Sequence, residues 1–286
     1  MFGVHNPPEG LTFKQMKEIC TATERQGYDI FTITDHLYPM RLESPGYPLE
    51  CWSTLAGLAA TTEKIKLGSL VSCVLYRNPA LLGKIATAVD IISNGRLILG
   101  IGAGWHESEF KAYFNRFPPV KERMDALEDS AQILRRMFSG EASTTFSGKL
   151  YHVDGLVNEP HPVQTRIPLM IGGGGEKRTL RIAARYGDIS HMPAGNDVGL
   201  VERKIEILKG HCRRAGRNFS DITVGVSITP IIEKGRFSAD TVRCIETCLK
   251  LGVKIFTLRF SALKGETIET QERFAKEVMY SFKSSN

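Results

Sequence analysis

The segment IKLGSLVSCVLYRNPALLGKIATAVDIISNGRLILGIG, residues 65–102, contains one complete strand–helix–strand pattern. Residues 65–71 and 96–102 are short apolar runs of strand length. Between them, Asn78 caps a helix whose first position is Pro79, where the missing proline N–H costs no hydrogen bond. The side chains expected to face inward from this helix are Leu81, Ile85, Val89 and Ile92. A strand, a helix and a second strand in this order are typical of a parallel sheet.

The same alternation continues from one end of the chain to the other. Predicted strands cover residues 2–4, 29–34, 65–71, 96–102, 167–171, 188–192, 222–232 and 254–260. A segment of helical periodicity follows each strand, and no linker-like stretch interrupts the series. Eight such units favour a (β/α)8 TIM barrel over a doubly wound sheet of about six strands with a second domain. The first βα turn, HNPPEG, has only one glycine and so lacks a dinucleotide fingerprint.

Length and irregular segments define the expected domain. The 286 residues exceed the roughly 250 that one α/β barrel needs. Residues 139–166 are irregular and rich in small and polar side chains, with a predicted small hairpin across Ser147-Gly148. We therefore predict a single α/β domain over residues 1–286, a TIM barrel with an insertion at about 139–166.

Charge and cysteine usage narrow the possible partners. The formal net charge is +6, but lysines and arginines are scattered among acids along the helical stretches. This pattern indicates mostly solvated faces, with a basic pocket for a phosphorylated or carboxylated ligand as the second interpretation. No basic tail with interleaved aromatic residues is present, so we predict no nucleic-acid partner. The six cysteines form no C-x-x-C pair, which favours a reduced, cytoplasmic protein.

Membrane and secretory classes are not expected. The opening residues MFGVHNPPEG lack a charged segment followed by an apolar core, which a signal peptide requires. No uninterrupted apolar run approaches the length of a bilayer span. We predict a soluble intracellular protein with a small-molecule substrate and no membrane partner.

Chemistry in such a barrel is expected at the carboxyl ends of the strands. The candidate residues at these positions are His5, Asn6, Asp35, His36, residues 69–73, residues 102–106, residues 172–175, His191, Met192 and Arg259. The pair Asp35-His36 follows the second strand and has two interpretations, a structural cap or a catalytic pair. Its position at the barrel mouth favours catalysis, with His36 exchanging a proton and Asp35 organising His36, orienting the loop or hydrogen-bonding a polar ring edge.

Four consecutive glycines follow the fifth strand in IGGGGEKRTL, residues 171–180. Backbone N–H groups at the start of a helix can bind a phosphate, so Gly172, Gly173, Gly174 and Gly175 form the predicted phosphate site. A tight turn is the alternative, although four glycines exceed what a turn needs. The G-K-[ST] ending of a P-loop is absent, which argues against ATP or GTP hydrolysis.

The loop GIGAGW, residues 100–105, is one residue short of the G-x-G-x-x-G fingerprint. Its small residues, Gly104 among them, would let a flat ring approach the backbone. Trp105 either flanks that ring or packs beneath the following helix. His106 and Glu107 begin an H-E-x-x-H pattern, but Phe110 occupies the place of the second histidine, so we predict no metal site. The sequence contains no G-x-S-x-G elbow, so a hydrolytic triad is not predicted.

Four segments carry a resemblance to a known family. They are TDHL (residues 34–37), IKLGSLVSCVLYRNPALL (65–82), ISNGRLILGIGAGWHESEF (92–110) and IPLMIGGGGEKRTLRIAARYGD (167–188). Together they resemble the bacterial luciferase-like monooxygenase superfamily and, within it, the branch of coenzyme F-420-dependent oxidoreductases, which use 8-hydroxy-5-deazaflavin. The resemblance extends over nearly the whole chain in order and implies a barrel with an insertion.

The resemblance implies a role for each matching position. Asp35 and His36 would lie beside the deazaflavin ring, with His36 transferring a proton during hydride movement at ring carbon C5. The segment that would pass behind the ring consists of Ser69, Leu70, Val71 and Ser72. Relatives have a non-prolyl cis peptide there, which we assign to Ser69-Leu70. The glycines at 173–175 would hold the coenzyme phosphate.

The expected function is hydride transfer between coenzyme F-420 and a small organic substrate, and the resemblance also implies a homodimer. The alternatives are an FMN-dependent luciferase-like monooxygenase and a non-catalytic flavin- or deazaflavin-binding protein. One position departs from the sugar-phosphate dehydrogenase branch, because Trp105 stands where that branch has an acid. Oxidation of a sugar phosphate is therefore not predicted, although Glu107 or Glu109 is available to substitute from the next turn.

Overall fold

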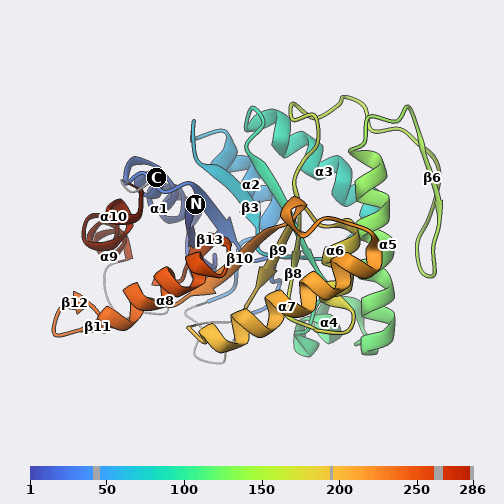
Figure 1. Cartoon of the computed structure of the whole chain (residues 1–286). Coiled ribbons are helices and arrows are strands. Elements are labelled where there is room, and N and C mark those ends of the chain that lie inside the picture. The colour runs from blue at the N-terminus through green and yellow to red at the C-terminus, as the bar shows by residue number, and fades with distance from the viewer. Residues whose placement is uncertain (41–45, 194–195, 261–266, 284–286) are drawn as a thin grey trace.

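The computed structural model of the chain describes residues 1–40, 46–193, 196–260 and 267–283. Its main sheet is parallel throughout, in the order β3-β2-β1-β13-β10-β9-β8-β5-β4, and an additional pairing of β3 with β5 closes it into a barrel (Figure 1). The strands are β1 (Phe2–His5), β2 (Ile30–Ile33), β3 (Lys66–Ser69), β4 (Ser72–Cys73), β5 (Leu97–Gly102), β8 (Leu169–Gly172), β9 (Ile189–Met192), β10 (Thr223–Ile228) and β13 (Val253–Leu258).

Strands β3 and β4 occupy one position in the barrel, because both pair with β5. The barrel therefore has eight strand positions, and the predicted (β/α)8 fold is confirmed. A cis peptide bond joins Leu70 to Val71 between these two strands, so the assignment to Ser69-Leu70 is wrong by one residue. Ser69 still belongs to β3, where it pairs in register with Ile33 of β2.

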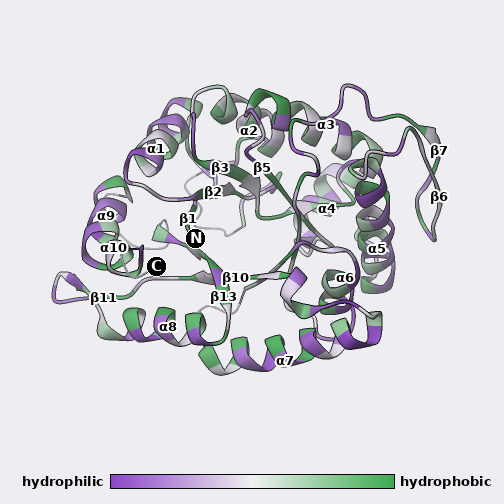
Figure 2. Ribbon diagram, turned by 45° about the horizontal axis from the view of Figure 1, so that its top comes forward, coloured by the Kyte–Doolittle hydropathy of each residue, from purple (hydrophilic) through white to green (hydrophobic). Residues whose placement is uncertain are grey.

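Helices surround the barrel strands on the outside (Figure 2). They are α1 (Phe13–Arg25), α2 (Cys51–Ala59), α3 (Pro79–Ile92), α4 (Glu107–Phe114), α5 (Val120–Met137), α6 (Thr179–Tyr186), α7 (Val198–Ala215), α8 (Ala239–Lys250), α9 (Thr267–Phe274) and α10 (Tyr280–Lys283). A 3-10 turn (Phe219–Asp221) precedes β10, and a π-helical segment (Ala275–Met279) joins α9 to α10.

Two elements differ from the sequence prediction. Helix α4 was not expected between the fourth barrel strand and α5. The seventh strand ends at Ile228 instead of residue 232, because Pro230 has no N–H to donate to a sheet. The residues beyond it form a separate antiparallel hairpin of β11 (Ile232–Glu233) and β12 (Arg236–Phe237).

Helix α3 turns a different face inward from the predicted one. Val89 is buried as expected, but Leu81 and Ile92 are 55% and 47% exposed. The buried face consists of Pro79, Leu82, Gly83, Ala86, Thr87, Val89 and Asp90. Asp90 is tolerated there because Gln164 donates to its carboxylate from both the backbone N–H, at 3.0 Å, and the side-chain amide, at 2.7 Å.

The irregular segment after α5 contains the predicted hairpin. Strands β6 (Thr144–Ser147) and β7 (His152–Leu156) pair antiparallel, and the Gly148 N–H donates to the Tyr151 carbonyl across the turn. The Tyr151 hydroxyl donates to the Val74 carbonyl at 2.8 Å, which ties the hairpin to the barrel. Among the helices of the described ranges, none has both the length and the apolar composition of a membrane span.

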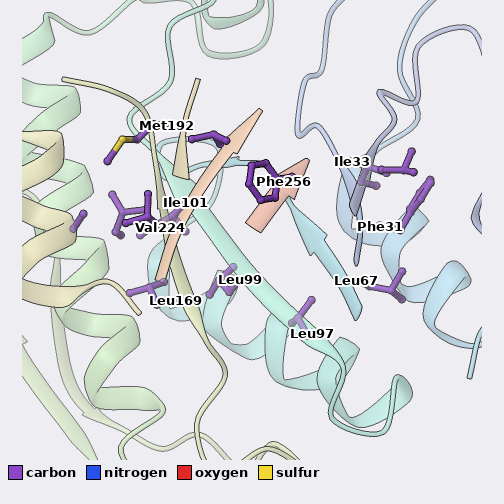
Figure 3. Close-up of a cluster of buried hydrophobic side chains, with 14 of the residues drawn as sticks. Phe31, Ile33, Leu67, Leu97, Leu99, Ile101, Leu169, Met192, Val224 and Phe256 are labelled. Atoms are coloured by element: carbon purple, nitrogen blue, oxygen red, sulfur yellow. The ribbon is translucent and has the colours of Figure 1, made fainter. Parts of the chain in front are cut away.

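The hydrophobic core has two layers, because successive side chains of a strand point to opposite faces. The outer layer lies between strands and helices and includes Phe31, Leu67, Leu99, Leu169 and Phe256 (Figure 3). The inner layer fills the amino-terminal half of the barrel with Ile30, Ile98, Met170, Ile189 and Ile255. Toward the carboxyl ends the strands carry glycines and polar residues instead, which leaves the barrel hollow at that end.

Candidate active site

A cavity of about 730 Å³ opens at the carboxyl ends of the barrel strands. Residues from the ends of most strands line it, as the barrel architecture requires. They include His5, Asp35, His36, Leu70, Val71, Gly102, Gly104, Trp105, Glu109, Gly172, Gly173, His191 and Arg259. The residues predicted for catalysis or cofactor binding that the structure brings together around this cavity are Asp35, His36, Leu70, Val71, Gly104, Trp105, Gly172 and Gly173.

His36 is held by a buried glutamate. Its Nδ1 lies 2.9 Å from Oε1 of Glu109, and the Leu37 N–H donates to Oε2 at 2.9 Å. The Tyr76 hydroxyl also donates to Oε1. Burial disfavours the charged form of Glu109, but these hydrogen bonds outweigh it and hold the pKa of Glu109 below its ordinary value. An ionised Glu109 favours the tautomer with the proton on Nδ1, which leaves Nε2 as the ring nitrogen that can accept a proton.

Asp35 has a different partner from the expected one. Its carboxylate accepts two hydrogen bonds from Arg77, at 2.7 and 3.1 Å, and Arg77 also contacts Glu50 at 2.5 Å. Burial raises the pKa of Asp35, and the Arg77 ion pair offsets part of that rise. The interpretation of Asp35 as the group that orients His36 is not supported, because Glu109 makes that contact.

The bulge after β3 forms one wall of the cavity. Leu70 and Val71 line it, and Val71 lies directly on two glycines. A Cβ on Gly102 would lie 2.6 Å from Val71 Cγ2, and a Cβ on Gly172 would lie 2.5 Å from Val71 Cγ1. Only glycine at both positions leaves room for the Val71 side chain in this arrangement.

The two serines of the same segment lie behind this wall. Ser69 donates to the Gly100 carbonyl at 2.8 Å, and Ser72 accepts from the indole N–H of Trp52 at 2.9 Å. Neither serine lines the cavity. Of the four residues predicted to pass behind a ring, Leu70 and Val71 face the cavity, while Ser69 and Ser72 anchor the bulge.

The glycine loop lies at the edge of the cavity and ends at α6. Gly172 and Gly173 line the cavity, whereas Gly174 and Gly175 lie beyond its lining. Gly173 has φ +120, a value that side chains rarely adopt. Lys204 of α7 donates from Nζ to the Gly174 carbonyl at 2.5 Å, which places a positive charge beside the loop. No sequence pattern predicts this lysine as a site residue.

Gly104 and Trp105 form the rim. Gly104 has φ +75, and a Cβ there would lie 2.5 Å from Cys73 Sγ. Trp105 is 61% exposed and meets His36 edge to face, with ring centroids 5.5 Å apart. Of the two interpretations of Trp105, the structure therefore supports a residue beside the cavity over one packed beneath the helix.

The floor of the cavity contains two neutral histidines. His5 Nδ1 lies 3.0 Å from Thr32 Oγ1, and His191 Nε2 lies 2.9 Å from Thr257 Oγ1. Burial, with the nearby charge of Arg259, lowers the pKa of His5 to about 3. Burial lowers the pKa of His191 to about 4. Both imidazoles are therefore uncharged near neutral pH.

One group of side chains in the described ranges has the spacing of metal ligands. His36, His106 and Glu109 each offer an atom within 4.8 Å of the other two. The His36 Nδ1 and both carboxylate oxygens already take part in the hydrogen bonds given above. The absence of a metal site stays a prediction.

Comparisons with known proteins agree with this architecture. The family described as luciferase-like monooxygenase matches residues 2–279. The F420-dependent glucose-6-phosphate dehydrogenase of Gordonia bronchialis is 29% identical over 213 residues, which cover 73% of this chain and 62% of the relative. The match thus spans less than two thirds of that relative's length.

Two solved structures share the fold. An F420-dependent secondary alcohol dehydrogenase in complex with an F420-acetone adduct superimposes with a TM-score of 0.83 at 17% identity, over 96% of this chain and 97% of that one. The monooxygenase RslO1 of Streptomyces bottropensis has a TM-score of 0.82 at 16% identity, over 98% and 99%. At these identities the likeness establishes the barrel fold. It does not distinguish an F420-dependent dehydrogenase from a monooxygenase.

Proposed function

The chain belongs to the luciferase-like monooxygenase family, and on that premise we propose that it is a coenzyme F-420-dependent oxidoreductase acting on a small organic substrate. The observation that carries the proposal is the cavity wall at Val71, seated on Gly102 and Gly172, with His36 on the same cavity. The F420-dependent relative at 29% identity supports the choice of cofactor.

The residues present fit a deazaflavin with a phosphate-bearing tail. Leu70 and Val71 offer an apolar wall for a flat ring, and the neighbouring glycines keep the space before it open. The Gly173 N–H already donates to the His191 carbonyl at 3.0 Å, so Gly174 and Gly175, with Lys204 beside them, are the part of the loop that offers backbone N–H groups and a positive charge to a phosphate. When bound, the deazaflavin supplies a ring carbon that accepts or releases a hydride.

In this proposal His36 moves the proton that accompanies hydride transfer. Glu109 fixes its orientation and keeps Nδ1 protonated, so Nε2 accepts a proton from a substrate hydroxyl or returns one to a carbonyl oxygen. Asp35 pairs with Arg77 and holds the loop next to the wall. Trp105 covers one side of the opening.

Titration of the purified protein with coenzyme F-420 and, separately, with FMN tests the cofactor. We expect F-420 to bind one equivalent and FMN to bind at least about tenfold more weakly, a difference of about 1.4 kcal/mol. Changes in cofactor fluorescence give both constants. Tight binding of FMN with none of F-420 would reverse the assignment and favour the monooxygenase.

A matched pair of glycine variants checks that the ring lies against Val71. In Gly172→Ala the new Cβ would displace Val71, so F-420 binding should weaken about tenfold, within the range that overpacking costs. Gly199→Ala on α7 is the control, because its Cβ meets nothing closer than 3.5 Å. Equal affinities of the two variants would contradict the ring position.

A homodimer is the proposed assembly. Leu81, Ile85, Ala88 and Ile92 recur along α3 at spacings of four, three and four, the pattern of a helix that packs on another helix. Ile85 is partly buried against the core, and the other three are exposed. Leu81 and Ile92 are both exposed in the single chain. An apolar stripe of this kind favours burial against a second copy.

Charging this stripe should separate the subunits. The double variant Leu81→Glu, Ile92→Glu is expected to elute as a monomer in size-exclusion chromatography with light scattering, while the parent elutes as a dimer. Leu249→Glu on α8, also exposed in the single chain, is the control and should stay dimeric. A monomeric parent at micromolar concentration would refute the assembly.

We also propose a cytoplasmic location. All six cysteines are free and buried in the structure. Free thiols in this number are typical of a reducing compartment.

A further inference from the structure

Arg259 lies at the end of the last barrel strand and points into the barrel. Its backbone N–H donates to the Ile228 carbonyl at 3.0 Å, which continues the pairing of β13 with β10. Thr257, two residues earlier, faces the barrel interior, where its hydroxyl contacts His191 and Ser227. Residues two apart on a strand share a face, so Arg259 stands above Thr257 toward the open end and lines the cavity.

The guanidinium of Arg259 has no carboxylate within ion-pair distance among the residues that the structure describes. Its Nε is buried and has no hydrogen-bond partner there. The acids around the cavity are already engaged. Asp35 pairs with Arg77, Glu109 with His36, and Glu9 accepts from the Met40 N–H. A half-buried guanidinium without a counterion is unfavourable, so this position favours an anion.

The residues that line the cavity together with Arg259 are suited to an oxygen-bearing anion. His5 and His191 are neutral, so neither repels Arg259 near neutral pH and neither neutralises an incoming anion. Thr34 also lines the cavity, and its buried hydroxyl has no hydrogen-bond partner in the described part of the chain. Ser227 adds a second hydroxyl to the lining. One cation and two hydroxyls therefore face the same space.

We propose that Arg259 binds an anionic oxygen group, a carboxylate or a phosphate, on the substrate. A guanidinium presents two parallel N–H donors, which match the paired oxygens of either group. The inference rests on the proposed function in one respect, that the anion belongs to the substrate while the cofactor phosphate occupies the glycine loop. Substrates would then be small organic acids or phosphate esters with the reacting carbon directed toward His36.

Calorimetric titration with three probes of similar shape tests the site. The probes are benzoate, phenyl phosphate and the neutral benzamide, added to protein saturated with coenzyme F-420. We expect at least one anion to bind about tenfold or more tightly than benzamide, because hydrogen bonds to charged groups are the strong ones. Comparing benzoate with phenyl phosphate tells a carboxylate site from a phosphate site.

Variants assign the preference to Arg259. Arg259→Gln should lose the preference for the anion, and Arg259→Lys should keep part of it because the charge remains. Arg203→Gln is the control, since Arg203 is exposed on α7 and pairs with Glu176. Melting curves of all three variants verify that they are folded. An unchanged preference in Arg259→Gln, or anions that bind the parent no better than benzamide, would overturn the proposal.

The same titration without cofactor separates this inference from the proposed function. If F-420 does not bind at all, the preference for an anion and its loss in Arg259→Gln are still measurable on the free protein. Lys204→Gln reports on the glycine loop in that experiment. Anion binding that is lost in Lys204→Gln and kept in Arg259→Gln would place the anion at the glycine loop and reject Arg259.

Discussion

Replacing His36 with alanine should lower turnover by about 10²- to 10⁴-fold, the usual contribution of a positioned acid or base. The cavity keeps its wall and its glycine loop in this variant, so coenzyme F-420 should bind with nearly unchanged affinity. The loss should appear in kcat more than in KM, because the proton moves only in the transition state. Stopped-flow measurement of F-420 oxidation or reduction with an accepted substrate gives the rate.

Two further variants make the His36 result specific. His152→Ala removes an exposed histidine of β7 whose ring hydrogen-bonds Ser147, and its turnover should match the parent. Glu109→Gln keeps the shape but removes the charge that holds the Nδ1 proton, so an intermediate loss and a shifted pH profile are expected. Turnover in His36→Ala equal to that of the parent would remove the proton-transfer role.

Replacing Arg77 with methionine should destabilise the fold by about 3–5 kcal/mol, because it leaves the buried Asp35 carboxylate without its partner. The double variant Arg77→Met, Asp35→Asn should recover part of that loss, since it removes the charge as well. Arg203→Met breaks an exposed ion pair with Glu176 and should cost no more than about 1 kcal/mol. Urea unfolding of the variants gives the three free energies.

The loss in Arg77→Met should grow as the pH rises. Burial already raises the pKa of Asp35, and without Arg77 only a hydrogen bond from Ser72 still opposes that rise. Between the unfolded carboxyl pKa of about 3.9 and the higher folded value, the folded state binds more protons than the unfolded chain. The free energy of unfolding therefore falls as the pH increases through this window. A deficit that shrinks with rising pH would show that Asp35 does not carry this charge.

Sequence reasoning was reliable for features that depend on neighbouring residues. The periodicity of each segment is local, so the alternation of strands and helices, and with it the eight-stranded barrel, could be predicted. The barrel rule then placed His36, Leu70, Val71, Trp105 and the first glycines of the loop at one end, where they line one cavity. Local composition also identified the hairpin at Ser147-Gly148.

The errors concern which side of an element faces the core and where a distortion falls. Leu81 and Ile92 of α3 are apolar yet exposed, whereas Asp90 is buried because Gln164, far along the chain, satisfies it. A periodicity cannot distinguish an apolar face that packs on the barrel from an apolar face that is exposed in the single chain. The cis bond at Leu70-Val71 likewise depends on how β3 and β4 both pair with β5.

By itself, the sequence determined the barrel, the end at which chemistry is expected and most of the residues around the cavity. The tertiary structure decided the partners of the charged groups. Glu109 meets His36 across 73 residues of chain, Arg77 meets Asp35 across 42, and Lys204 meets Gly174 across 30. No local pattern encodes these contacts, because each joins residues from different strand–helix units. Only closure of the barrel brings those units together and leaves Arg259 facing the cavity without an acidic partner among the described residues.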